Sequence, residues 1–233
     1  MKIAVFSIPE LSLGKHNVKD SRLDQVDAIT RSKKKTYAQL ELVAGDLVLD
    51  AEAILVLKDS VTDLILKDLE FVETRLSRTE QEQEKKFLIK LKGILEKEEP
   101  VFAQQFSDEE KKMISTYGMS TARPIIDAER SELDSLNDIL SRCLKASGFI
   151  SFFTTGEKET RAWPVKKGTS AWEAAGQVHS DIQKGFIRAE VISFNDFIQA
   201  GSETQAKQQG KMRLEAKDYV VQDADLMNFR FNK

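Results

Sequence analysis

The fold of the C-terminal part of this chain is decided by residues 149–194, FISFFTTGEKETRAWPVKKGTSAWEAAGQVHSDIQKGFIRAEVISF. Two runs of aromatic and β-branched residues flank the turn TGEKE, which predicts a β-hairpin. Thr169 or Ser170 can cap the helix that follows, along which apolar residues recur at helical spacing: Trp172, Ala175, Val178 and Ile182. IRAEVISF predicts another strand. A polar, helix-prone stretch then leads to a final strand pair centred on DYVV (218–221) and LMNFRF (226–231).

The order of these elements is β-β-α-β-β-β, with a short helix before the last two strands and one main helix across the sheet. This order predicts a mixed α+β unit and suits the β-grasp fold. The two tryptophans of the chain, Trp163 and Trp172, are expected to be packing residues of this unit and not a stacking platform.

The first 147 residues alternate short apolar runs with helical patterns. We expect strands at 2–8, 36–43, 51–57 and 123–126; loops at 9–20 and 31–35; and helices at 21–30, 61–98, 107–117 and 130–147. Residues 61–98 carry leucine, isoleucine and valine at spacings of three and four, with a polar break near 78–84. They predict two amphipathic helices, either as one rod or as an antiparallel hairpin.

The composition excludes several classes of protein. A single cysteine, Cys143, leaves no partner for an intramolecular disulfide, and two histidines offer little to a metal site, so we expect no metal. No stretch approaches the roughly 20 apolar residues of a membrane span, and the N-terminus lacks the pattern of a signal peptide, so we expect a cytoplasmic protein. Only 5 of the 11 glycines lie in residues 1–148, which is sparse for phosphate-binding loops.

The C-terminal runs 152–163, 166–198 and 210–232 together closely resemble the TGS domain of the YchF (Obg-like ATPase) family. This resemblance covers residues 148–233 and implies a ubiquitin-like β-grasp. The remainder resembles the same family less closely. It implies an α+β multidomain protein in which residues 1–60 and 119–147 form a reduced P-loop-NTPase-like α/β domain. Residues 61–118 would then form an inserted antiparallel helical hairpin of the coiled-coil type.

The nucleotide motifs that the resemblance implies are degraded here. A phosphate loop needs G-x-x-x-x-G-K-[ST], whereas this chain has Ser7 at the first position and two extra residues before Gly14-Lys15. His16 stands where a hydroxyl should hold Mg²⁺. Gly14 and Lys15 are thus a remnant of a nucleotide site at most. The D-x-A-G turn is replaced by residues 43–46, VAGD, and the base-recognising motif by 127–131, DAERS, which contains no asparagine.

We therefore expect a non-catalytic binding protein that has no catalytic residues and needs no cofactor. The family resemblance implies a ribosome- or RNA-linked regulatory role. Basic residues around the first C-terminal hairpin and helix would face the RNA or remain ordinary surface charge: Arg161, Lys166, Lys167, Lys184 and Arg188. The helical arm could bind a protein partner, and no membrane is expected. Two alternatives remain: a divergent ATP- or GTP-hydrolysing enzyme that uses Mg²⁺, and a scaffold that oligomerises through the arm.

Overall fold

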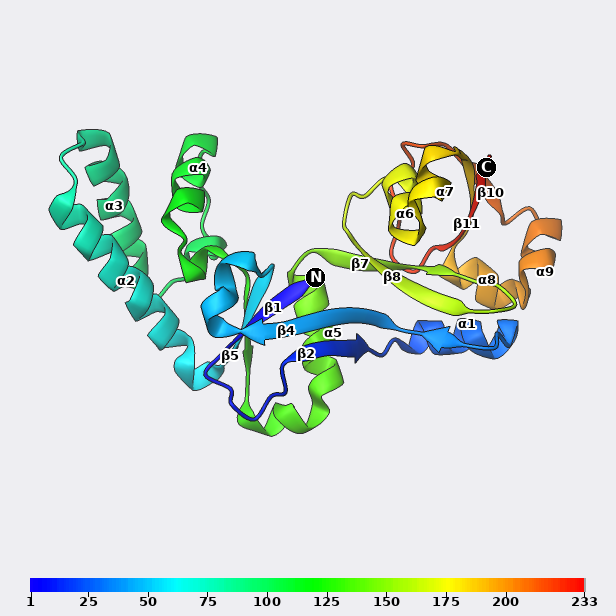
Figure 1. Ribbon diagram of the computed structural model, residues 1–233, viewed down its shortest axis with the longest axis horizontal. Helices are drawn as coiled ribbons and strands as arrows, with labels where there is room; N and C mark the ends of the chain where they lie inside the picture. The colour runs from blue at the N-terminus through cyan, green and yellow to red at the C-terminus, as the bar shows by residue number, and fades with distance from the viewer. Residues whose placement is uncertain (233) are drawn as a thin grey trace. The chain divides into compact units, whose positions relative to one another are not determined.

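A computed structural model of the protein describes residues 1–232. The chain divides into two compact units (Figure 1). Unit one contains Met1–His16 and Leu40–Ser147, and unit two contains Asn17–Gln39 and Gly148–Lys233. Segment 17–39 therefore belongs with the C-terminal residues, although the sequence places it inside the first domain.

Unit one is built around a five-stranded sheet with the strand order β2-β4-β1-β5-β6. The bounds of these strands are Gly14–Val18, Ala38–Ala44, Lys2–Phe6, Ala53–Leu57 and Ile125–Ala128, respectively. Strand β1 runs parallel to β4 and to β5, and β5 runs parallel to β6. Every residue of β5 is buried, as expected for a central parallel strand that is covered on both faces. Strands β2 and β4 carry the chain out of unit one and back.

Helices make up the rest of unit one. Residues 61–98 form α2 (Val61–Arg78) and α3 (Glu82–Leu95). Residues 79–81 connect the two helices, which pack against each other. Helix α4 (Asp108–Tyr117) begins with the capping box of Ser107 and Glu110 and ends at Gly118, which is left-handed. The three helices share an apolar core around Val72, Leu88 and Leu91. The sequence expected one helix over 130–147, but the chain forms a 3₁₀ segment, Arg130–Ser135, and then α5 (Leu136–Ala146).

Asp68 joins this helical region to the sheet of unit one. It lies on α2 and is buried, and its carboxylate accepts hydrogen bonds from the Ser120 amide (3.0 Å), the Thr121 amide (2.7 Å) and the Thr121 hydroxyl (2.7 Å). Ser120 and Thr121 begin the short turn that leads into β6. Burial is the main cause that raises the pKa of Asp68, and the three donors oppose it.

Unit two contains a six-stranded sheet with the order β10-β9-β11-β7-β8-β3. The bounds of these strands are Arg213–Glu215, Phe186–Ile192, Leu226–Phe231, Phe149–Thr154, Thr160–Lys166 and Lys35–Thr36, respectively. Strands β7 and β8 form the expected hairpin, and β11 runs parallel to β7. Helices α6 (Ala171–Val178) and α7 (Ser180–Lys184) cover one face, where Phe152, Val191 and Phe229 form the core.

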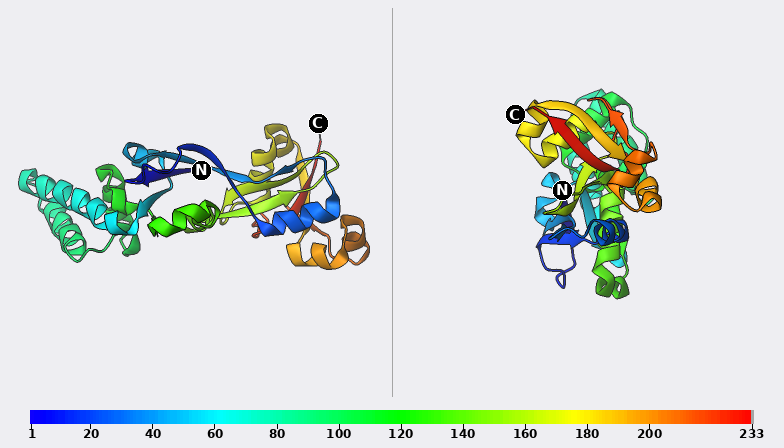
Figure 2. Two further views of the ribbon diagram at one scale, coloured as in Figure 1. Left: turned by 90° about the horizontal axis from the view of Figure 1, so that it is seen from below. Right: turned by 90° about the vertical axis from the view of Figure 1, so that its right-hand side faces the viewer.

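Segment 17–39 completes unit two from the other side of the same sheet. Strand β3 pairs in parallel with β8 at the edge, and helix α1 (Ser21–Thr30) packs on β8 (Figure 2). Leu23 and Val26 of α1 are fully buried. Two further helices, α8 (Phe194–Ala200) and α9 (Glu203–Gln208), follow β9, and α1 contacts α8.

Four local predictions differ from the structure. The polar loop expected at 9–20 contains strand β2, and strand β6 lies two residues beyond the expected 123–126. DYVV forms only one isolated bridge, between Val220 and Ser170, and Arg213–Glu215 takes the place of the expected strand. The helix expected after Ser170 breaks at His179, whose extended backbone ends α6 and whose ring accepts a hydrogen bond from the Asp181 amide to begin α7.

Candidate functional site

The loop after β1 occupies the position where a phosphate loop would lie. Phosphate loops bind their anion because the backbone amides of the loop and of the following helix N-terminus converge on it. Here Ser7 has a left-handed backbone, the Leu11 amide donates to the Ile8 carbonyl (3.3 Å), and the chain then enters strand β2. Gly14 and Lys15 are the first two residues of that strand, so no helix N-terminus follows them.

The first helix after this loop is α1, which belongs to unit two and is already capped. The Asp20 side chain accepts a hydrogen bond from the Arg22 amide (2.9 Å) at the helix N-terminus. The Asp20 carboxylate is also bound by the Arg22 guanidinium (2.8 Å). A carboxylate thus occupies the place that an anion would take at this helix end.

The carboxyl ends of β1, β4, β5 and β6 meet at one edge of the sheet, which is where ligands bind in open parallel sheets. The residues that directly follow these strands are Ser7, Gly45, Lys58 and Glu129. Gly45 begins the turn after β4, and a Cβ atom there would lie 2.9 Å from the Val5 carbonyl oxygen. The turn therefore requires glycine for a close approach to β1, even though no aspartate precedes it as in the family's D-x-A-G turn.

Lys58 is one of the cations at this edge, and it is paired with a carboxylate. Its ammonium lies 3.1 Å from Glu129, and this contact is the main cause that raises its pKa, with Asp127 and Asp59 adding to it. Glu129 also begins a capping box with Glu132, whose carboxylate accepts from the Glu129 amide (2.7 Å). The segment that replaces the base-recognising motif is therefore engaged in local structure and carries negative charge.

The basic residues predicted to face RNA are separated by the sheet of unit two. Arg161 lies 4.0 Å above the Trp163 ring, on the face that α6 covers. Lys166 lies 4.4 Å above the Phe149 ring on the opposite face. Lys167 follows in the turn, where its amide donates to the Gly148 carbonyl. The five residues therefore do not form one continuous patch on this sheet.

Lys184 and Arg188 lie on other elements of unit two, on α7 and on strand β9. Lys184 ends α7, 3.9 Å from Asp181, and 79% of its side chain is exposed. Arg188 stands directly opposite Arg230 across β9 and β11, next to a bulge in the pairing. Glu190 forms an ion pair with Arg230, whereas the Arg188 guanidinium donates to the Ile187 carbonyl.

Trp172 was expected to be a packing residue of this unit, and it is more exposed than that expectation implied. Its side chain is 41% exposed on α6, whereas Ala174 and Ala175 of the same helix are fully buried. Trp163 is half-buried as expected, with its indole N–H donating to the Thr154 hydroxyl. The sequence pattern placed Trp172 on the apolar side of one long helix, but its position at the start of a short helix leaves it exposed.

Unit one also contains a groove of about 760 Å³ that the sequence did not predict. It lies between α4, the turn at 101–103 and the segment after β4, and its lining is mainly apolar: Leu49, Phe102, Phe106, Ile114 and Met119. Arg123 at its base donates to the carbonyls of Ala51 and Leu49. Among residues 1–232, no group of histidine, cysteine or acidic side chains is positioned to hold a metal, and no helix is long and apolar enough to cross a membrane.

Comparison with known proteins identifies relatives of both units. A family model described as YchF-GTPase_C, protein of unknown function (DUF933), matches residues 149–232. The chain is 33% identical to the ribosome-binding ATPase YchF of Bacillus subtilis over 235 residues, which cover 73% of this chain and 64% of that protein. It is 47% identical to the protein of the same name from Haemophilus influenzae over 123 residues, covering 46% and 34%.

The chain thus spans less than two thirds of the length of these curated relatives. Among solved structures, the fold is similar to that of the Schizosaccharomyces pombe YchF GTPase, with a TM-score of 0.74. The match covers 99% of this chain and 97% of the solved chain at 19% sequence identity. The mixed α/β fold with several parts is therefore shared with that structure.

Proposed function

Because this chain belongs to the YchF family, we propose that it acts as a ribosome- or RNA-linked binding protein that does not bind or hydrolyse a nucleotide. Relatives in this family are named ribosome-binding ATPases, which supports the ribosome as the partner. Such a partner would place the protein in the cytoplasm.

The loss of nucleotide binding rests on one observation: the loop after β1 continues into strand β2. A triphosphate needs converging amides and a nearby cation. Here Gly14 and Lys15 are in a strand, and Lys58, a cation that directly follows β5 at the sheet edge, is paired with Glu129. The continuation of this loop into a strand, together with the pairing of Lys58, favours a binding role over the alternative of a divergent NTPase.

We further propose that residues 148–233 form the family's TGS β-grasp domain and that residues 61–118 form its helical insertion. The hairpin β7–β8, the helix α6 and the parallel return of β11 beside β7 support the first assignment. The paired helices α2 and α3 support the second. The apolar groove beside α4 offers the arm a surface for a protein partner.

The loss of nucleotide binding is tested by titrating the protein with ATP and with GTP in the presence of Mg²⁺ by isothermal calorimetry. We expect no heat of binding at micromolar nucleotide concentrations. A micromolar dissociation constant that Lys15→Ala abolishes would contradict the proposal and support the NTPase alternative.

A further inference from the structure

Trp172 is an exposed residue whose indole N–H and backbone amide each donate a hydrogen bond. Its ring N–H donates to the Gln183 carbonyl on α7 (3.1 Å), and its backbone amide donates to the Lys217 carbonyl (3.2 Å). The polar edge of the ring is therefore already satisfied, while 41% of the side chain remains exposed. What this side chain offers to a partner is an oriented aromatic surface.

The surroundings keep the ring in place. The segment after β10 is bound along the start of α6, because the Ala171 amide donates to Tyr219 (2.7 Å) and the Val221 amide donates to Thr169 (3.0 Å). On the other side, α7 packs against α6, and the Gln183 side-chain amide lies over Gly176, 2.7 Å from where a Cβ atom would be. Ordering the ring on binding therefore costs little conformational entropy.

One exposed apolar residue lies beside the start of the helix that carries Trp172. Val220, which is 47% exposed, pairs with Ser170 beside the helix start. Two exposed lysines lie beside the hydrogen bonds of Trp172. Lys184 follows Gln183, whose carbonyl accepts from the indole N–H, and the Lys217 carbonyl accepts from the Trp172 backbone amide. The nearest acid on the helix, Glu173, is bound to the Ser170 amide and hydroxyl in the capping box.

We propose that Trp172 is a stacking site for an unpaired base of single-stranded RNA, with Lys184 and Lys217 contacting the adjoining phosphates. A fixed aromatic surface beside flexible cations is the usual design for binding single strands with little sequence preference. A protein-binding hot spot would instead need an apolar surround that is depleted of lysine. This inference rests on the proposed function and adds the chemical class of the ligand and the residue that binds it.

The test uses the full chain and an oligouridylate of about 12 nucleotides, a length within the site sizes of single-strand binders. In Trp163→Phe, Trp172 is the only tryptophan, so its fluorescence reports the site directly. We expect the RNA to quench this signal. Trp172→Ala should weaken binding about tenfold to hundredfold, whereas Trp172→Phe should stay within about threefold of the unmodified chain because it keeps an aromatic face. Leu214→Ala, a matched exposed apolar control in the same unit (58% exposed), should bind unchanged.

Equal RNA binding by Trp172→Ala and the unmodified chain, or no RNA binding by either, would overturn the stacking site. Co-sedimentation with ribosomes separates this failure from that of the proposed function. If the unmodified chain pellets with ribosomes but does not bind the oligouridylate, the ribosome-linked role stands and the RNA assignment is wrong. If Trp172→Ala loses only ribosome binding, the site takes a protein partner, which also overturns the RNA assignment.

Discussion

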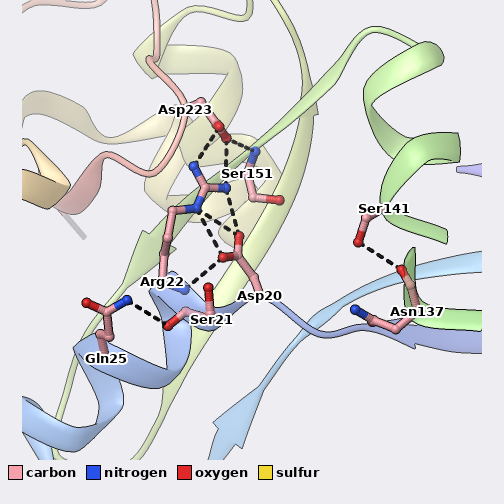
Figure 3. A network of polar contacts seen from close by, with 8 residues as sticks. All are labelled: Asp20, Ser21, Arg22, Gln25, Asn137, Ser141, Ser151 and Asp223. Carbon is pink, nitrogen blue, oxygen red and sulfur yellow. Dashed lines mark hydrogen bonds and ion pairs between the residues drawn. The ribbon is translucent and has the colours of Figure 1, made fainter. Parts of the chain in front are cut away.

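Arg22 on helix α1 and Asp223 before strand β11 form an ion pair with 2.7 Å between Nη1 and Oδ2, although 201 positions separate them in the chain (Figure 3). Asp223 also accepts from the Ser151 amide at 3.1 Å, so one carboxylate joins α1, β7 and the approach to β11. The hydrogen bonds that the Arg22 guanidinium donates to Asp20 are the main cause that raises the pKa of Arg22, and Asp223 adds to it. This network fixes segment 17–39 in unit two.

Replacing Arg22 with alanine should lower the free energy of unfolding of unit two by roughly 1–2 kcal/mol, because two partly exposed carboxylates lose their shared cation. Both tryptophans lie in unit two, so urea unfolding followed by their fluorescence reports this unit. Lys158→Ala, an exposed cation on the β7–β8 turn, is the control and should change nothing. An Arg22→Ala midpoint equal to that of the control would show that the ion pair does not hold the segment.

Leu23→Ala should destabilise the same unit by more, about 2–5 kcal/mol, because the fully buried side chain of Leu23 is replaced by a cavity beneath α1. The fluorescence-detected unfolding of unit two should therefore shift to a clearly lower urea concentration. Leu214→Ala removes the same atoms from an exposed position and should leave the midpoint nearly unchanged. An unchanged midpoint for Leu23→Ala would mean that α1 does not pack on this sheet in solution.

Asp68→Ala should destabilise unit one by about 2–4 kcal/mol, since the amides of Ser120 and Thr121 and the Thr121 hydroxyl lose their acceptor in a buried place. Thermal unfolding followed by far-ultraviolet circular dichroism measures this loss. Glu70→Ala, an exposed acid on the same helix, serves as the comparison. Similar melting temperatures for the two variants would contradict the role given to Asp68.

The stability of unit one should also depend on pH through Glu84. Its carboxylate accepts hydrogen bonds from Thr79 and from Arg75, and these lower its pKa below the ordinary glutamate value of 4.5. A folded-state pKa below the unfolded one stabilises the folded state at pH above 4.5, and this contribution disappears as pH falls through the lowered value. Melting of Glu84→Gln should therefore differ from that of the unmodified chain more at pH 7 than at pH 3. An equal difference at both pH values would contradict this linkage.

The sequence predicted local structure well where burial is strong and failed where distant pairing decides. The apolar run of β5 and the capping box at Ser107 each identify their element without help from the rest of the chain. Strand β2, GKHNV, alternates only weakly between exposed and buried residues, and its pairing with β4 makes it a strand. The apolar side of α1 was visible as Leu23 and Val26, but two residues cannot specify which sheet they cover.

The candidate sites show the same limit. The departures from the phosphate-loop pattern could be predicted from the sequence because each chemical group of a phosphate loop has a fixed spacing. The basic residues looked like one cluster in sequence, yet alternation along β8 sends Arg161 and Lys166 to opposite faces of the sheet. The exposure of Trp172 depends on the break at His179 and on the segment that binds the start of α6, neither of which has a clear local signal.

The most direct test of the proposed function is co-sedimentation of the purified chain with ribosomes, with and without ATP and Mg²⁺. A binding protein that has lost its nucleotide site should pellet with ribosomes to the same extent under both conditions. The Trp172→Ala variant should be depleted from the pellet, and the Leu214→Ala control should not. Binding that appears only with ATP, or that is lost in Lys15→Ala, would contradict the account, and so would the absence of the unmodified chain from the ribosome pellet.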